Sequence, residues 1–428
     1  MISKETIKEI IKSNEQFINN QISKILPRQG LPITTRLKKV NVIYGVRRSG
    51  KTFVLYELFK QNKGRALYID FEDERLNGIA ISELDKIRES FFELYPHLLY
   101  KKDVIFLFDE IQNVLEWERY ARRLVEREAI TLYVAGSSSK INPQNISSSL
   151  RGREWAVPLF PFSFREFLMA QGIVLDKSIL YGKEKMMLSR YLLEYLKYGG
   201  FPEVVFAKSD FDKQKILYQY LNAMFFKDLV EQFNINNLNL LEALRENLFA
   251  NFSSKFSGLA FYKQFKGRFP LSKSSIFTYY RAFIQSMLTF ETRVFSPSSY
   301  RRLRNPAKVY LVDIGIASRT KSFDWGRALE NIVFLELIRN GYEIYYNAAE
   351  YECDFIIKKS GRIFEPLQVT WEITDENRGR EYNGLIEACK MLKKKKGFII
   401  TKDQEFEEEL NGIKIKTIPF VKWLIMTN

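Results

Sequence analysis

Eight residues near the beginning of the chain have the types and spacing of a phosphate-binding loop. Residues 45–52, GVRRSGKT, match the pattern GxxxxGK[ST]. In this pattern glycine lets the backbone curl so that N–H groups face phosphate oxygens, and the helix that follows adds the positive end of its dipole. ATP with Mg²⁺ is a ligand that such a loop suits. The contacts that the pattern predicts are Gly45, Val46, Arg47, Arg48, Ser49, Gly50, Lys51 and Thr52.

Four side chains could divide the chemistry of ATP hydrolysis between them. Lys51 is expected to reach the β- and γ-phosphates, and Thr52 to bind Mg²⁺. Residues 103–112, DVIFLFDEIQ, form an apolar run that ends in two acids. There Asp109 can hold the Mg²⁺ shell, and Glu110 is placed to orient the attacking water. A switch that only binds nucleotide has little need for Glu110, so the two acids favour hydrolysis.

Three further polar residues could complete this site. Residues 130–141, ITLYVAGSSSKI, predict a strand with Ser137 at its end, where a hydroxyl suits a γ-phosphate sensor or caps the next helix. Arg151 and Arg153 follow after a helix-length gap. An arginine so placed can act on a phosphate of its own chain or of a neighbouring subunit. We name Arg153 as the arginine finger. A surface-loop role is the alternative, and a role in trans would require a homo-oligomer.

Strand, loop and helix must follow one another if these residues are to meet. Residues 40–44 are a short β-rich apolar run, and residues 53–61 have apolar side chains at helical spacing. The fully apolar run before Asp109 is typical of a central strand in a parallel sheet. The sequence therefore predicts an α/β P-loop ATPase domain over residues 1–165. After it, a helix break at GGFP suggests a helical lid over residues 166–235.

Six short segments in a fixed order make the chain resemble a known family. They are GVRRSGKT, LFDEIQN, VAGSSS, LRGR, PFSFREF and GGFPEVV. In this order they are similar to the archaeal and bacterial P-loop ATPases of the AAA+/STAND type. The resemblance covers essentially the whole chain, since those ATPases often carry a C-terminal domain like the one considered below. Paired arginines at the loop tip recur in that family. On physical grounds, Arg47 and Arg48 could contact nucleotide phosphate, a neighbouring subunit or the lid.

One region carries most of the positive charge. Residues 252–312 hold eleven lysines and arginines and a single acid, which is +10 of the net charge of +15. Such a one-sign block favours an anionic polymer, and DNA is our candidate. The bases are Lys255, Lys263, Lys266, Arg268, Lys273, Arg281, Arg293, Arg301, Arg302, Arg304 and Lys308.

The same region has the outline of a winged helix-turn-helix. Over residues 236–304 the pattern predicts three helices and a strand pair. The third helix carries Lys273 and Arg281, which we name as DNA contacts, and Tyr279 as a weaker candidate. Winged helices also dock proteins, and that alternative stays open here.

The last part of the chain resembles a nuclease. In residues 305–428 a helix with Glu330 precedes a strand with Asp354, and a further strand carries Gln368 and Thr370. This order resembles the PD-(D/E)xK fold, in which Glu330 and Asp354 would hold a divalent metal ion. The third strand of that fold should bring an acid and a lysine, two residues apart on one face.

The residues of that third strand put the cutting chemistry in doubt. A glutamine binds metal weakly, and a threonine cannot supply the cation that stabilises developing negative charge. Lys390, on the following helix, is the alternative source of a cation. We therefore predict a degenerate domain that binds nucleic acid or supports the fold without cutting. An active ATP-dependent nuclease is the alternative.

Composition limits the setting and the function. The chain has 428 residues and no apolar run near the roughly 18 that a membrane helix needs. Two cysteines, Cys353 and Cys389, cannot form a disulfide framework, so we expect a reducing cytoplasm. The function predicted is Mg²⁺-dependent ATP hydrolysis coupled to a conformational change, on DNA. The runner-up is an ATP switch that acts on protein partners.

Overall fold

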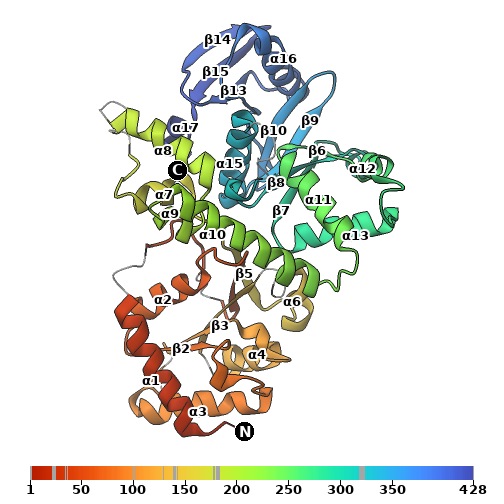
Figure 1. The fold of residues 1–428 in the computed structure, drawn as a ribbon. Helices are drawn as coiled ribbons and strands as arrows, with labels where there is room; N and C mark the ends of the chain where they lie inside the picture. Colours follow the sequence, from red (N-terminus) through yellow and green to blue (C-terminus); the bar gives the residue numbers. More distant parts are fainter. Residues whose placement is uncertain are drawn as a thin grey trace. The chain divides into compact units, whose positions relative to one another are not determined.

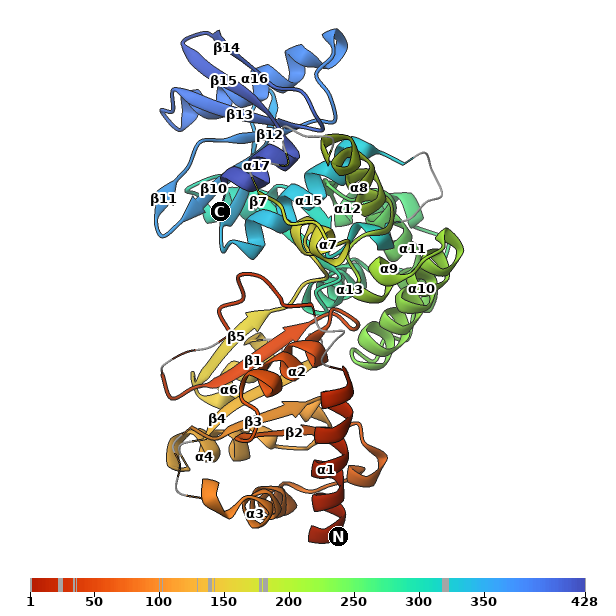
Figure 2. The ribbon, with the colours of Figure 1, turned by 90° about the vertical axis from the view of Figure 1, so that its left-hand side faces the viewer.

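The computed structural model in Figures 1 and 2 divides into two compact units, each made of several segments. It describes residues 2–21, 26–33, 35, 37–99, 101, 103–128, 130–137, 141, 143–176, 179, 184–317 and 323–427. The first unit consists of Met1–Pro161, Ala223–Phe233 and Gln285–Met287. The second consists of Phe162–Asn222, Asn234–Ile284 and Leu288–Asn428.

A five-stranded parallel sheet forms the centre of the first unit. Its strands are β1 (Val40–Gly45), β2 (Ala66–Asp70), β3 (Ile105–Asp109), β4 (Thr131–Ser137) and β5 (Glu154–Pro158). They lie in the order β2-β3-β4-β1-β5, and every neighbouring pair is parallel. The predicted parallel α/β sheet is therefore confirmed. All five carboxyl ends lie at one edge, where ligands of such sheets bind.

Helices cover both faces of this sheet. They are α1 (Lys4–Gln21), α2 (Lys51–Gln61), α3 (Leu84–Leu94), α4 (Trp117–Arg127) and α6 (Pro143–Leu150). Successive strand residues point to opposite faces, so Val42 packs in one hydrophobic cluster with α3, α4 and α6, while Ile43 packs in another with α2. Helix α1 contributes to both clusters through Ile7 and Ile18.

The second unit begins with helices. They are α7 (Phe164–Ala170), α8 (Glu184–Tyr198), α9 (Pro202–Phe206), α10 (Asp210–Ala223), α11 (Leu238–Ala250), α12 (Gly258–Phe265) and α13 (Lys273–Gln285). The predicted helix break falls between α8 and α9. There Gly199 has a left-handed backbone, and the N–H of Gly200 donates to Asp313 Oδ2 at 2.7 Å. Helix α10 runs directly into a π-helix, Met224–Glu231, which belongs to the first unit.

A ten-stranded sheet forms the rest of the second unit. Its main path is β14-β15-β13-β12-β10-β9-β7-β8-β6, and β11 pairs with β10. The strands are β6 (Ser254–Phe256), β7 (Thr289–Val294), β8 (Ala307–Leu311), β9 (Glu343–Ala348), β10 (Glu352–Lys359), β11 (Arg362–Ile363), β12 (Leu367–Val369), β13 (Lys396–Thr401), β14 (Phe406–Leu410) and β15 (Ile413–Pro419). The accompanying helices are α14 (Ser299–Arg304), α15 (Trp325–Arg339), α16 (Asp375–Met391) and α17 (Phe420–Met426).

The strands of the expected winged helix belong to this same sheet. Strand β7 pairs with β8 antiparallel and with β9 parallel. The region boundary expected at residues 304–305 therefore falls inside one continuous sheet.

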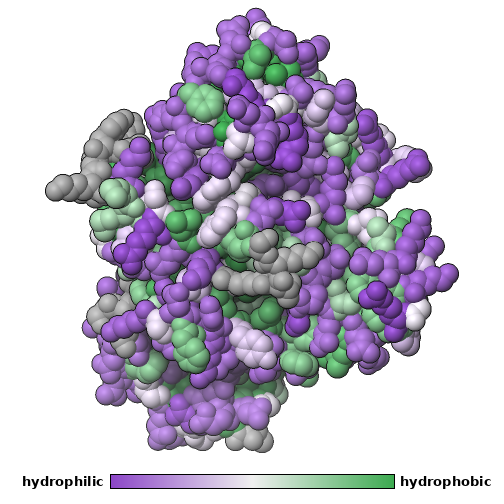
Figure 3. Space-filling view, turned by 45° about the horizontal axis from the view of Figure 1, so that its top comes forward, coloured by the Kyte–Doolittle hydropathy of each residue, from purple (hydrophilic) through white to green (hydrophobic). Residues whose placement is uncertain are grey.

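None of the helices in the described part of the chain is long and apolar enough to cross a membrane. Figure 3 presents a face covered mainly by hydrophilic side chains, with hydrophobic ones in small groups between them.

Candidate functional site

The phosphate-binding loop joins the end of β1 to the first turn of α2. Strand β1 ends at Gly45 and α2 begins at Lys51. Arg48 (φ 65°) and Gly50 (φ 96°) have left-handed backbones, which curl the loop between them. A Cβ on Gly45 would lie 2.1 Å from the backbone oxygen of Leu159, so a larger residue does not fit there. The loop is therefore a tight turn that leads directly into the N-terminus of α2. A helix N-terminus is a common binding site for phosphate.

Lys51 and Ser49 have polar atoms inside this loop. The Lys51 ammonium donates hydrogen bonds to the backbone oxygens of Gly45 (3.1 Å) and Val46 (3.0 Å). Burial lowers the pKa of Lys51, and nearby acids act in the opposite direction. The Ser49 hydroxyl is buried and has no hydrogen-bond partner among the described residues. A phosphate would pair with both groups, so the loop fits the expected ligand.

Thr52 and Asp109, the expected Mg²⁺ ligands, lie together. Asp109 ends β3, is buried, and accepts a hydrogen bond from the Tyr68 hydroxyl at 3.2 Å. Burial and then Glu110 raise the pKa of Asp109 to about 7, while a hydrogen bond with Thr52 acts against this shift. The two side chains therefore fit Mg²⁺, which when bound supplies positive charge to phosphate oxygens.

Glu110 lies one residue beyond β3, with a left-handed backbone (φ 49°). Its N–H donates to Asp109 Oδ1 at 3.1 Å, and its carboxylate accepts a hydrogen bond from the amide of Gln112. Gln112 lies close against Gly136 of β4, where a Cβ would come within 2.0 Å of Gln112 Oε1. Gln112 thus holds the Glu110 carboxylate. Sequence reasoning missed this role, although Gln112 ends the quoted DEIQ.

Asp228 is a further acid at the loop that sequence reasoning missed. Arg47 Nε donates to Asp228 Oδ1 at 2.9 Å, and the two side chains are 23% and 7% exposed. Burial opposes the charge of Arg47, but Asp228, together with Glu110 and Glu72, outweighs burial, so the pKa of Arg47 is raised. Asp228 comes from the π-helix of the first unit. Its only signal in the sequence is one acid in the mostly apolar run FFKDLV.

Ser137 and Arg153 lie at opposite ends of the parallel strands: Ser137 at the carboxyl ends and Arg153 at the amino ends. Ser137 ends β4, level with the end of β1 and beside the loop, as expected. Arg153 precedes β5, where its backbone oxygen accepts from the N–H of Val40 at 2.8 Å. The length of β1, roughly 16 Å, separates that point from the loop. The Arg153 side chain forms an ion pair with Glu126. This position does not suit a finger for the loop of the same chain. Only a role in trans stays a prediction.

Helix α13 presents one charged face. Lys273 and Arg281 are exposed and eight residues apart, and exposed Phe277 lies midway on the same side of the helix. The opposite side is buried through Ile276, Tyr280 and Phe283. The Tyr279 hydroxyl accepts a hydrogen bond from the N–H of Asn237 at 3.2 Å, which gives Tyr279 a structural contact at the start of α11.

Part of the basic block does not face solvent. Lys308 is 2% exposed, and Lys255 forms an ion pair with Glu352. The expectation that the block as a whole meets an anionic polymer is therefore wrong for Lys308. Apart from Lys255, the bases of this block that are exposed are Lys263, Lys266, Arg268, Lys273, Arg281, Arg301 and Arg304.

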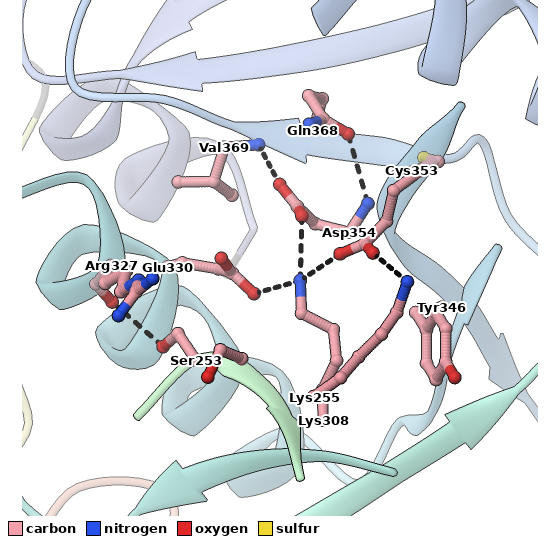
Figure 4. A network of polar contacts seen from close by, with 12 residues as sticks. Ser253, Lys255, Lys308, Arg327, Glu330, Tyr346, Cys353, Asp354, Gln368 and Val369 are labelled. Carbon is pink, nitrogen blue, oxygen red and sulfur yellow. Dashed lines mark hydrogen bonds and ion pairs between the residues drawn. The ribbon is translucent and has the colours of Figure 1, made fainter. Parts of the chain in front are cut away.

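Lys308 lies at the centre of a cluster of acids (Figure 4). Its Nζ is 2.7 Å from Glu330 Oε1, 2.9 Å from Glu352 Oε1 and 2.9 Å from Asp354 Oδ1. The Tyr310 hydroxyl donates to the same Glu330 oxygen at 2.7 Å. Burial alone would lower the pKa of Lys308, but the acids raise it well above its usual value. Burial and Asp354 raise the pKa of Glu330 to about 8.

The prediction that this acidic site has no cation nearby is therefore wrong. The cation comes from Lys308 on β8, and not from Thr370 after β12 or from the exposed Lys390 of α16. Lys308 and Asp354 are 46 residues apart in the sequence, so no local spacing pointed to their contact.

Gln368 has both ends of its amide engaged. Its oxygen accepts from the N–H of Asp354 at 3.0 Å, and its nitrogen donates to Glu381 Oε2 at 2.6 Å. The second oxygen of Asp354 accepts from the N–H of Val369 at 2.9 Å. In the described part of the chain, no three histidine, cysteine or acidic side chains are arranged to hold a metal ion. The geometry shows acids that bind an internal ammonium, where the resemblance implied a metal ion on Glu330, Asp354 and Gln368.

Comparison with known proteins decides the family. Residues 37–168 match the model of an AAA domain, and residues 189–325 match a domain of unknown function. The chain is 34% identical to an uncharacterised protein of Methanocaldococcus jannaschii, over 99% of this chain and 96% of that protein. The chain belongs to this family of AAA-domain proteins.

Other relatives of the AAA-domain protein were also found. A protein of Haemophilus influenzae is 28% identical, over 90% of this chain and 94% of its own length. Among solved structures, the Walker-type ATPase of Pyrococcus abyssi aligns with 16% identity and a TM-score of 0.41, over 71% of this chain and 94% of that one. The matched AAA domain contains Lys51, Thr52, Asp109 and Glu110.

Arg153 provides a test for assembly of the AAA domain. If Arg153 serves the loop of a neighbouring subunit, we expect Arg153→Ala to lower ATP turnover about 10³-fold, as removal of an arginine finger does. Mixing it with Lys51→Ala should restore part of the rate, because each chain supplies what the other lacks. Arg119→Ala, an exposed arginine of α4, is the control. No recovery on mixing, with a rate per chain that does not depend on concentration, would contradict the trans role.

Proposed function

We propose that the AAA domain binds ATP with Mg²⁺ and hydrolyses it. The meeting of four side chains at one edge of a parallel sheet supports this most strongly. Lys51 would neutralise phosphate charge, Thr52 and Asp109 would hold Mg²⁺, and Glu110 would orient the attacking water. The hydrogen bond from Gln112 keeps the Glu110 carboxylate fixed, so that little reorganisation is needed at the moment of reaction.

The second unit would use the nucleotide state to act on duplex DNA. Our proposed division keeps a helical lid at residues 166–235, of which Ala223–Phe233 lies in the first unit, a winged helix at 236–304 and a PD-(D/E)xK-like domain at 305–428. The exposed face of α13 supports DNA as the partner, since Lys273 and Arg281 could both meet phosphates. A DNA-stimulated ATPase assay is the direct test of the coupling.

The salt dependence of binding tests the DNA contacts. We expect duplex DNA to bind less tightly as salt increases, because lysines and arginines displace counterions from the phosphates. Neutralising Lys273 and Arg281 together should lower the slope of log affinity against log salt by about two. Fluorescence anisotropy with a labelled duplex measures it. Lys422→Ala, on α17, is the control. Absence of binding at low salt would favour a protein partner.

A protein partner is the second candidate, and one observation favours it. Large apolar side chains are exposed close in sequence to the bases, with Phe277 46%, Tyr300 69% and Leu303 74% exposed. Such side chains suit a protein interface better than a phosphate backbone. On this reading DNA would leave the ATPase rate unchanged, and an ATP switch would act on a protein.

The last region is proposed not to cut nucleic acid. The acids that would bind a metal are already paired with Lys308, and the Gln368 amide is engaged at both ends. A divalent ion would have to displace a buried ammonium from all three carboxylates. We therefore expect no nuclease activity because the acids are already occupied, and not because a cation is missing.

A further inference from the structure

The segment Ala223–Phe233 has a special place in the chain. It belongs to the first unit, while Phe162–Asn222 before it and Asn234–Ile284 after it belong to the second. Most of it is a π-helix. This conformation is rare in proteins, and where it occurs it is often at a functional site. A change that displaced this segment would reach the second unit through the covalent chain on both sides.

The ion pair of Arg47 with Asp228 joins this segment to the phosphate loop. Arg47 lies at the loop tip, and its Nε donates to Asp228 Oδ1 at 2.9 Å. Asp228 is also close enough to Lys51 to oppose, with other acids, the lowering of the Lys51 pKa by burial. A carboxylate that is 7% exposed therefore contacts Arg47, and its charge also acts on Lys51. ATP would bring a second anion to the same place.

We propose that Asp228 is the residue by which this protein distinguishes ATP from ADP. The γ-phosphate takes the Arg47 guanidinium from Asp228, and the segment that carries Asp228 is released. ADP has no γ-phosphate and leaves the ion pair intact. The exchange is one charge-assisted hydrogen bond for another, and the phosphate offers more negative charge and more acceptor oxygens than a carboxylate. This inference rests on the proposed function, since it requires ATP in the loop.

The sign of the change in affinity for Asp228→Asn tests the exchange. If ATP must first displace Asp228, the neutral amide is easier to displace, and the variant binds ATP about five-fold more tightly or more. Affinity for ADP changes less than about two-fold, because ADP does not compete for Arg47. If instead the pair persists with ATP bound, loss of the charge weakens ATP binding or leaves it unchanged, and the proposal fails.

A matched control and a double variant make the measurement specific. Glu231→Gln removes an exposed acid from the same π-helix and is expected to leave both affinities unchanged. In an Arg47→Gln background, Asp228→Asn is expected to have no further effect on ATP affinity, since the two residues then no longer interact. An equal gain with and without Arg47 would overturn the proposal.

Release of the segment has its own readout. Lys227 is exposed and adjoins Asp228, so trypsin cleavage after Lys227, read by mass spectrometry, reports opening. In a Glu110→Gln background that retains ATP, cleavage should be faster with ATP than with ADP, and Asp228→Asn should be cleaved fast without nucleotide. Equal cleavage in all states would refute the release.

The nucleotide titrations separate two failures. A wild-type chain that binds no ATP would overturn the proposed function, and the inference with it. A wild-type chain that binds ATP while Asp228→Asn shows unchanged ATP and ADP affinities would overturn the inference alone.

Discussion

Glu110→Gln is expected to reduce ATP turnover about 100-fold or more while ATP binding stays within about two-fold of wild type. The amide keeps the size of the side chain but cannot draw a proton from the attacking water. Lys51, Thr52 and Asp109 remain in place to bind the nucleotide and Mg²⁺. The production of inorganic phosphate measures the rate of ATP turnover, and titration with a fluorescent ATP analogue measures the affinity for ATP.

Two other variants define the roles around Glu110. Lys51→Ala should abolish ATP binding or turnover, because it removes the cation of the loop. Glu116→Gln neutralises an exposed acid a few residues later and should turn over ATP normally. A Glu110→Gln chain that hydrolyses ATP at the wild-type rate would show that the water is oriented by another group.

Lys308→Met should lower the free energy of unfolding of the second unit by about 3–5 kcal/mol, the cost of leaving buried charges without their partner. Three carboxylates lie within 2.9 Å of the Lys308 ammonium, and methionine keeps much of its volume without the charge. Urea unfolding, with hydrogen exchange of β8 to identify the unit, measures the loss.

The outer lysine of the same cluster is the matched control. Lys255 also binds Glu352, but its side chain is 38% exposed, so Lys255→Met should cost less than about 1 kcal/mol. Equal losses for the two variants would contradict a central role for Lys308.

The wild-type protein, incubated with supercoiled DNA and Mn²⁺, tests the expected absence of cutting. Cleavage that disappears in Asp354→Ala would show that metal displaces Lys308 from the acids.

The sequence by itself determined most of the candidate nucleotide site. The loop and the helix that follows it lie within residues 45–61, and the two acids directly end the apolar run of residues 103–112, so each of the two patterns is local. Their chemistry therefore shows as a short pattern. The parallel sheet then brings separate patterns together, because the carboxyl ends of its strands share one edge. That is why Ser137 and Asp109 could be placed beside the loop before any coordinates were known.

Only the tertiary structure decided two ion pairs, that of Arg47 with Asp228 and that of Lys308 with Asp354. It also decided where Arg153 lies relative to the loop. Asp228 is 181 residues from Arg47, and Lys308 is 46 residues from Asp354. An ion pair between distant segments has no period along the chain. From the sequence, a lysine in a strand is expected to be an exposed base unless the acids around it are known. Lys308 was wrongly counted among the bases that meet an anionic polymer for that reason. The position of Arg153 could not be predicted from the sequence either. Its distance from the loop is large because it lies at the amino end of β5, while the loop lies at the carboxyl end of β1.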